Sequence, residues 1–262
     1  MRSMIKHWLH IYGYAAAFAA LIVALWEACV RLDFVPSFII PAPSQIAVAI
    51  WIDRHPLFAV HLPVTLGEVL LGLGLSVGGG VLLAILMHLY RPVERMLYPL
   101  VIVSQTIPII AISPVFILWF GYTVWSKVAV TILIAFFPVV VNTYDGLRQG
   151  DKEYGELLRT MGASRLQLLT KVQIPMALPS FFSGLKLAVV FSVIGATIGE
   201  WLGASAGLGY FSRRMSSSLR ADELFAAVVL LSLLGMLLFG WVSLLERRML
   251  RRTNIQRRGR SK

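Results

Sequence analysis

The chain has 262 residues, of which 58% are hydrophobic and 14% are charged, and its formal net charge is +11. A soluble globular domain has about a quarter of its residues charged, so this composition excludes an ordinary soluble protein. Apolar runs recur at about 20 residues, the length that a helix needs to cross a bilayer. The sequence therefore predicts an all-α polytopic membrane protein that forms a single domain over residues 1–262.

Six transmembrane helices are predicted, and an even number puts both ends of the chain on one side of the membrane. In chain order the spans are Ile11–Val30, Leu66–Met87, Leu97–Trp119, Tyr122–Val141, Phe181–Leu202 and Leu224–Leu245. The first of them is longer than the apolar core of a signal peptide, and no small-residue cleavage site follows it. We therefore interpret it as a retained membrane helix.

The lysines and arginines are distributed unevenly between the two sides of these spans. Seventeen of the 24 lie in the N-terminal tail, the connections after spans two and four, and the C-terminal tail. Positive residues mark the cytoplasmic side, so both termini and the connection after span four are predicted to be cytoplasmic. The basic tail 247–262 is typical of a segment that meets anionic membrane lipid, and we do not expect it to bind nucleic acid.

Several residues within the spans are candidates for a pathway or a gate. Span two contains Gly74 and Gly78 at the spacing that lets helix backbones approach, and Pro108 and Pro114 predict kinks in span three. Charged residues inside membrane helices usually face a protein interior or a water-filled cavity, whereas Lys186 can reach the interface by extending its side chain. The candidates are Glu200, Glu68, Gln105, Pro108 and Pro114, with helix packing or a structural hydrogen bond as the alternative for each.

A polar insert at residues 153–175 interrupts the apolar chain after span four. Apolar residues at 154, 157, 158 and 161 follow the helical pattern i, i+3, i+4, i+7, and Gly162 stands where a helix C-terminal glycine would. Ser164 and Gln167 form a capping-box pattern for a second helix, which is predicted to stop at Pro175. The first helix is too short to be stable alone in water, so its apolar face is expected to dock on a membrane surface or on a partner.

The insert resembles the EAA loop of the inner-membrane permeases of binding-protein-dependent ABC importers. That family's pattern is Glu-Ala-Ala, three residues, Gly, nine residues and Ile-x-Leu-Pro, which is matched here by Glu156, Gly162 and "VQIP" ending at Pro175. Glu-Leu-Leu replaces Glu-Ala-Ala. The resemblance implies a coupling loop at about 145–180 within a permease core at about 62–246, and the coupling residues would be Glu156, Leu157, Leu158, Met161, Gly162, Ala163, Ser164 and Pro175.

Further stretches are similar to one branch of that family, which serves sulfonates, taurine, nitrate and thiamine-precursor pyrimidines. They are "FIIPAPSQI" at 38–46, "IPIIAISPVFILWFGY" at 107–122, "FFPVVVNTYDGLR" at 136–148 and "GLGY" at 207–210. The resemblance implies type I ABC importer architecture in a bacterial inner membrane. It also implies three partners: a cytoplasmic ATPase subunit, an extracytoplasmic solute-binding protein and a second permease copy, forming a homodimer. No cofactor is expected on this chain, because ATP and Mg²⁺ would be bound by the ATPase subunit.

Two other classes of protein fit the sequence less well than a permease. An ion-coupled secondary transporter needs coordinating groups at mid-membrane, and the predicted spans carry charges only near their ends. "GASAG" at 203–207 matches the G-x-S-x-G pattern, but that motif needs a strand–turn–helix context and partner His and Asp residues. No G-x-x-x-x-G-K-[ST] sequence occurs. We therefore predict no catalytic residue and no metal site, and an intramembrane hydrolase remains a remote alternative.

Overall fold

The computed structural model is helical throughout the part of the chain that it describes. It describes the backbone of residues 2–149, 158 and 162–252, and the side chains of residues 13, 14, 16–149, 158 and 162–250. No strand occurs in these residues, which confirms the predicted all-α class. The elements are α1 (Arg2–Arg31), α2 (Pro43–Ile52), η1 (Pro56–His61), α3 (Leu62–Leu89), α4 (Arg91–Ser104), α5 (Ile109–Phe120), α6 (Val124–Gln149), α8 (Arg165–Leu168), η2 (Leu169–Gln173), α9 (Ile174–Gly203), α10 (Leu208–Ser217) and α11 (Ala221–Arg252).

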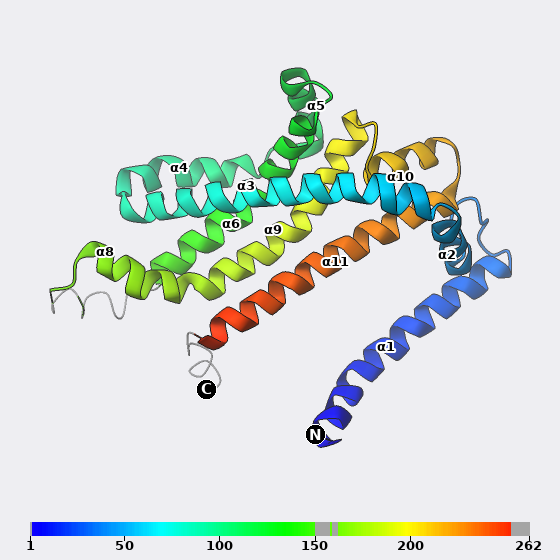
Figure 1. Cartoon of the computed structure of the whole chain (residues 1–262), viewed down its shortest axis with the longest axis horizontal. Helices are drawn as coiled ribbons and strands as arrows, with labels where there is room; N and C mark the ends of the chain where they lie inside the picture. Colours follow the sequence, from blue (N-terminus) through cyan, green and yellow to red (C-terminus); the bar gives the residue numbers. More distant parts are fainter. Residues whose placement is uncertain (1, 150–157, 159–161, 253–262) are drawn as a thin grey trace.

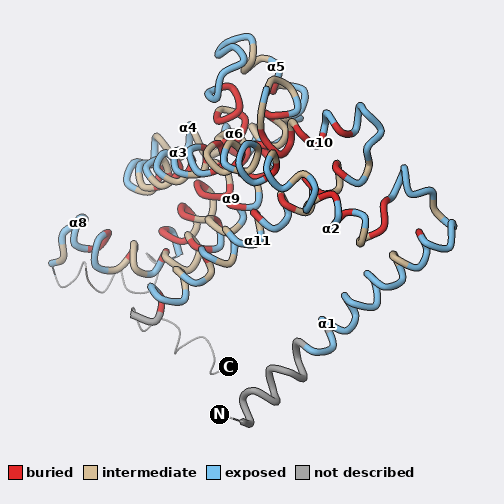
Figure 2. The backbone as a smooth tube through the Cα atoms, turned by 45° about the vertical axis from the view of Figure 1, so that its right-hand side comes forward, coloured by how far each residue is buried: buried red, intermediate tan, exposed pale blue. Residues whose placement is uncertain are grey.

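The long helices α3, α6 and α9 form the centre of the fold, and α6 and α9 make the most extensive helix pair. Glycines on α9 allow its backbone to contact α6. A Cβ atom on Gly184 would lie 2.5 Å from the carbonyl oxygen of Pro138, and one on Gly195 would lie 2.7 Å from Cα of Thr131. Helices in a membrane associate through such close packing, because lipid is as apolar as the side chains. Figure 2 shows that buried residues follow these helices, while the described side chains of α1, from residue 13 on, are mostly exposed.

Close helix approach on α3 occurs at different glycines from those that the sequence indicated. A Cβ atom on Gly74 or Gly78 would have no atom within 4 Å, whereas one on Gly72 would overlap the Thr131 side chain of α6. A helix turns by about 100° per residue, so a shift of two positions moves a residue onto another face. The spacing of the small residues was therefore informative, but it did not identify which face of α3 meets α6.

This difference predicts opposite effects for two alanine substitutions on the same helix. Gly72→Ala is expected to destabilise the protein by about 1–3 kcal/mol, because it overpacks the contact with Thr131. Gly74→Ala is expected to be neutral or stabilising, because alanine is the better helix former and the position is open. The thermal unfolding midpoints of the two purified variants in the same detergent test this. Equal losses in both variants would contradict the assigned α3–α6 contact.

Four helical segments of the described chain are long and apolar enough to cross a membrane. They are Pro56–Leu89, Val124–Gln149, Arg165–Gly203 and Ala221–Leu250, which correspond to predicted spans two, four, five and six. The helices α4 and α5 together qualify as a fifth segment, although they are bent by 105°. The chain is therefore a multi-pass membrane protein. The count of six spans and the cytoplasmic location of both termini stay predictions.

The third predicted span, Leu97–Trp119, is not one kinked helix but two helices. The helix α4 ends at Ser104, and α5 begins at Ile109 at an angle of 105° to it. Pro108 stands immediately before α5 in an extended conformation, with φ −64° and ψ 111°. Because proline lacks an N–H group and restricts the residue before it, the chain unwinds here rather than bending gently. Pro114 lies inside α5, and the helix continues through it.

The two ends of the helical bundle have different structures (Figure 1). We call the end that contains Leu89, Gln149 and α8 the loop end, because the polar insert lies there. We call the opposite end the cap end, because α2 and α10 lie there beside the start of α3 and the end of α9. The helix α1 extends away from the bundle, and it contacts α2 at the cap end.

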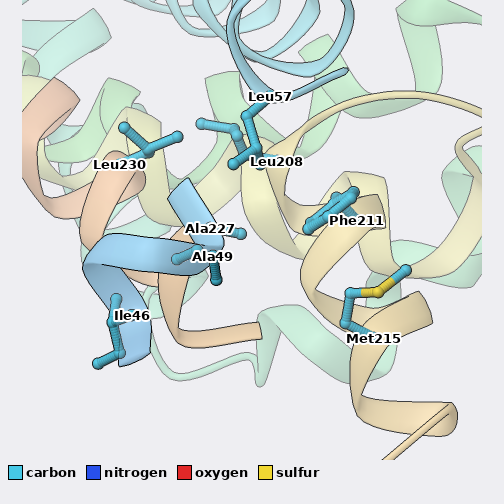
Figure 3. Close-up of a cluster of buried hydrophobic side chains, with 9 residues drawn as sticks. Ile46, Ala49, Leu57, Leu208, Phe211, Met215, Ala227 and Leu230 are labelled. Carbon is cyan, nitrogen blue, oxygen red and sulfur yellow. The ribbon is translucent and has the colours of Figure 1, made fainter. Parts of the chain in front are cut away.

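An apolar cluster joins the elements at the cap end (Figure 3). The side chains of Leu208, Phe211 and Met215 on α10 pack with Leu57 of η1 and with Leu230 of α11. Residues of α2 complete the cluster. No helix was predicted at residues 208–217, a short segment that carries Arg213 and Arg214. Its apolar residues recur at 208, 211 and 215, which is one helix face and was the signal available for it.

Candidate functional site

The glycine turn of the insert has the predicted conformation. Gly162 has a φ of +83°, and the N–H of Ala163 donates a 3.0 Å hydrogen bond to the carbonyl oxygen of Leu158. A bond from an N–H group to the carbonyl five residues earlier, with a left-handed glycine between them, is the longer of the two bonds of the Schellman motif that ends helices. Leu158 is helical and half-buried. Of the other predicted coupling residues before this turn, Glu156, Leu157 and Met161 lie outside the described residues.

The capping box after the turn is confirmed. The backbone N–H of Ser164 donates to Oε1 of Gln167 at 2.9 Å, and the N–H of Gln167 donates to Oγ of Ser164 at 3.2 Å. These two bonds satisfy donors that the first turn of a helix would otherwise leave free. The segment that leads into α8 is therefore fixed on both sides, by Gly162 at the turn and by Ser164 at the start of the helix.

The prediction that the second helix stops at Pro175 is wrong. The chain continues from α8 through the π-helical turn η2 (Leu169–Gln173) into α9, and Pro175 lies in the first turn of α9. Proline in a regular helix removes a hydrogen bond and clashes with the carbonyl four residues earlier. The wider π turn relieves this conflict just before the proline. The insert is thus continuous with the membrane helix, and this segment is helical from Arg165 to Gly203.

Side chains of three long helices hold the segment that follows the turn. Leu169 of η2 packs with Leu147 of α6 and Ala177 of α9 in a buried cluster. Nε2 of His88, in the last turn of α3, lies 2.9 Å from Oε1 of Gln173. The loop end of the bundle therefore binds the segment by apolar packing and by a polar contact to a helix that is distant in sequence.

At the cap end, a buried ion pair joins α3 to α6. Nζ of Lys127 lies 2.9 Å from Oε1 of Glu68, and the two side chains are 8% and 1% exposed. The second oxygen, Oε2 of Glu68, has no hydrogen-bond partner among the described residues. A buried pair contributes little net stability, but removal of one partner leaves a buried charge uncompensated. The pair therefore constrains how α3 and α6 can separate.

Glu200 lies beside this pair and caps the start of α10. Its Oε2 accepts hydrogen bonds from the N–H groups of Gly209 at 2.5 Å and Tyr210 at 3.3 Å. Its Oε1 accepts a 2.6 Å bond from Oγ1 of Thr65, which itself accepts the N–H of Leu208 at 2.8 Å. A carboxylate at a helix N-terminus satisfies free donors and complements the helix dipole. Side chains of α3 and α9 thus fasten α10 to the bundle.

The remaining pathway candidates lie at the bend between α4 and α5. Gln105, Pro108 and Pro114 are exposed on the surface of the single chain. Ile110 follows the bend and lines an apolar cavity of about 630 Å³ together with Trp201 of α9 and residues of α11. The five candidates therefore fall into two groups. Glu68 and Glu200 are buried at the cap end, whereas Gln105, Pro108 and Pro114 are exposed at or near the break between α4 and α5.

Four polar residues of these sites were missed by sequence reasoning or given another role. Lys127 was counted only as a charge near the membrane surface, and Thr65, His88 and Gln173 were not singled out. A usable signal existed for Lys127, because Glu68 and Lys127 lie at similar depth in spans two and four and opposite charges in a membrane pair with each other. Lys186, interpreted as reaching the interface, instead pairs with Glu246 of α11 at 2.9 Å.

Comparison with known proteins identifies the family. Residues 76–251 match the model described as "Binding-protein-dependent transport system inner membrane component". The chain belongs to this family. It is 48% identical over 229 residues to the formylaminopyrimidine transport permease protein of Halalkalibacterium halodurans, covering 87% of this chain and 91% of that protein. It is 32% identical over 237 residues to a Bacillus subtilis permease protein named for aliphatic sulfonates transport, covering 90% and 86%.

The fold is shared with solved permeases. The crystal structure of an amino acid ABC transporter superposes with a TM-score of 0.61 at 21% sequence identity, covering 76% of this chain and 96% of that one. The chain is therefore a permease subunit of an ABC importer, a multi-pass component of the cell membrane. Relatives named for formylaminopyrimidine and sulfonates also agree with the branch that the sequence motifs resembled.

Proposed function

We propose that this permease forms the membrane pathway for a small aminopyrimidine and couples to a separate ATPase subunit through its polar insert. The observation that carries the coupling is the rigid turn at Gly162. The backbone bond across this turn and the capping box that follows fix the geometry of residues 162–167 of the insert. A partner that pushes on such a loop moves the attached helices instead of deforming the loop.

The proposed solute class rests on the difference in sequence identity between this chain and two relatives that are named for different solutes. Identity is 48% to a permease named for formylaminopyrimidine and 32% to one named for aliphatic sulfonates. We therefore propose a formylated aminopyrimidine as the solute, delivered by an extracytoplasmic binding protein. An uptake assay with cells that express the full system tests this choice. Competition by an aliphatic sulfonate, with no competition by a formylated aminopyrimidine, would overturn it.

The bend between α4 and α5 is an argument for a homodimer, in which a second copy of the chain lies beside the pathway. The helix α4 has 14 residues, so the bend lies roughly 20 Å from the loop end, well within a bilayer core of about 30 Å. Irregular backbone at that depth is tolerated only where protein buries it or where it lines a water-filled cavity. Gln105 and Pro108 are exposed in the single chain, so in the proposed homodimer the other copy and the pathway would cover them.

ATP hydrolysis by the reconstituted complex tests the coupling proposal. Gly162→Pro is expected to abolish solute-stimulated hydrolysis, because proline cannot adopt a φ of +83°. Gly162→Asn is the matched control. Asparagine tolerates the left-handed region, no atom lies within 4 Å of a Cβ atom there, and this variant should stay close to native. Glu156→Lys should also weaken assembly with the ATPase subunit. Normal stimulation in Gly162→Pro, or uptake without any ATPase subunit, would refute the coupling proposal.

A further inference from the structure

The junction between the polar insert and α9 is the π-helical turn η2 (Leu169–Gln173). A π turn is wider than an α turn and less regularly bonded, and such turns often occur at functional positions. Motion of the insert must pass through this turn to reach α9. A flexible junction would dissipate the motion by bending, so its stiffness matters for the coupling proposed above.

A polar contact between described residues joins this junction to α3. Gln173, the last residue of η2, is 3% exposed, and its Oε1 lies 2.9 Å from Nε2 of His88. A carbonyl oxygen can only accept, so the ring nitrogen of His88 is the donor. The two residues are 85 positions apart in sequence. Unlike the apolar packing of Leu169 nearby, a hydrogen bond has a required direction, so it fixes the rotation of the turn as well as its distance from α3.

The surroundings of this contact are open. A polar cleft of about 860 Å³ separates the connection between α3 and α4 from the segment after Gly162, and its lining includes Tyr90, Arg91, Ala163 and Arg165. His88 and Gln173 lie in the wall of the same cleft. Their hydrogen bond therefore lies at the edge of a cleft between the two segments. Its removal would weaken the attachment of the junction to α3 and leave the apolar packing of Leu169 in place.

At its other end α3 holds the cap. Oγ1 of Thr65 bonds both Glu200 and the N–H of Leu208 at the start of α10. The 23 residues between Thr65 and His88 correspond to roughly 35 Å of continuous helix. The same helix thus contacts the junction of the insert at the loop end and the start of α10 at the cap end.

We propose that His88 is a positioning residue for coupling, which fixes the junction between the insert and α9 to α3 by its hydrogen bond to Gln173. Displacement of the insert then moves α3 and α9 together, and the contacts of Thr65 carry this movement to α10. The inference rests on the proposed coupling to an ATPase subunit. It adds a named contact through which the insert acts on the far end of the membrane domain.

The test uses the reconstituted complex of permease, ATPase subunit and binding protein. The measured quantity is the ratio of hydrolysis with solute-loaded binding protein to hydrolysis without it. His88→Leu removes the donor and is expected to lower this ratio about two- to tenfold, the range that one hydrogen bond supports. His88→Gln keeps an N–H donor and should restore most of the ratio. The loss from combining His88→Leu with Gln173→Leu should be smaller than the sum of the two single losses, since both substitutions remove this bond.

Tyr144→Phe is the matched control. The Tyr144 hydroxyl donates a 2.5 Å bond to Oε1 of Glu94, which joins α6 to α4, and neither residue belongs to the insert. This variant should keep the native ratio. An unchanged ratio in His88→Leu, an equal loss in Tyr144→Phe, or failure of His88→Gln to restore the ratio would each overturn the inference. If the native complex shows no stimulation at all, the proposed coupling itself fails, so the two failures are distinguishable.

Discussion

Replacing Lys127 with methionine is expected to destabilise the protein by about 3–5 kcal/mol, the typical cost of removing one partner from a buried ion pair. Methionine approximates the length of the lysine side chain, so little packing volume is lost. The carboxylate of Glu68, however, would stay buried with its charge uncompensated, and one of its oxygens already has no hydrogen-bond partner among the described residues. Thermal unfolding in detergent, followed by the loss of helical circular dichroism, measures the effect.

Two further variants show whether the loss of stability comes from an uncompensated buried charge or from the loss of any lysine that forms an ion pair. Lys186→Met removes the lysine of the pair with Glu246, which joins α9 to α11. The two side chains of that pair are 23% and 18% exposed, so the expected loss is below about 1 kcal/mol. The double variant Glu68→Gln with Lys127→Met removes both charges, and it should recover much of the stability lost in Lys127→Met alone. Similar unfolding midpoints for Lys127→Met and Lys186→Met would contradict the buried state of the Glu68–Lys127 pair.

Local sequence patterns predicted the features that depend on a few neighbouring residues. The left-handed Gly162 and the capping box of Ser164 and Gln167 were both foreseen, because each depends on contacts within six residues. The long apolar helices were also foreseen, because their length is set by the bilayer. Pro175 was misread for the opposite reason: a proline ends a regular helix, and nothing local indicates the π turn that accommodates it.

The candidate sites could be predicted only in part, because their partners are distant in sequence. Glu200 and Glu68 were singled out by their charge alone, but neither residue type nor spacing identifies Thr65 as the partner 135 positions from Glu200. Likewise, the bond between His88 and Gln173 depends on how α3 packs beside the insert. Helix packing in a membrane follows close contacts between small residues. Within this chain α3 makes such contacts at Gly72 and Gly80, not at Gly74 and Gly78.

Gly207→Val is expected to release α10 from the bundle. Gly207 has a φ of +120° and a ψ of 157°, a region that essentially only glycine occupies. A Cβ atom there would also overlap the carboxyl group of Glu200, which accepts hydrogen bonds from the first turn of α10. The substituted chain must therefore distort its backbone and displace Glu200. Amide hydrogen exchange at residues 208–210 should accelerate strongly, because these N–H groups lose their side-chain acceptors.

A second route to the same result and a matched control make this prediction specific. Glu200→Leu leaves the backbone of Gly207 unstrained but removes the acceptor of two N–H groups, at a cost of about 1–3 kcal/mol for each donor left unsatisfied. It should accelerate exchange at residues 209 and 210. Gly240→Val is the control, because a Cβ atom there would have no atom within 4 Å. Both Thr65 of α3 and Glu200 hold α10. If exchange stays slow in both test variants, the apolar packing of Leu208, Phe211 and Met215 alone fixes the helix. The polar contacts would then have no part in positioning it.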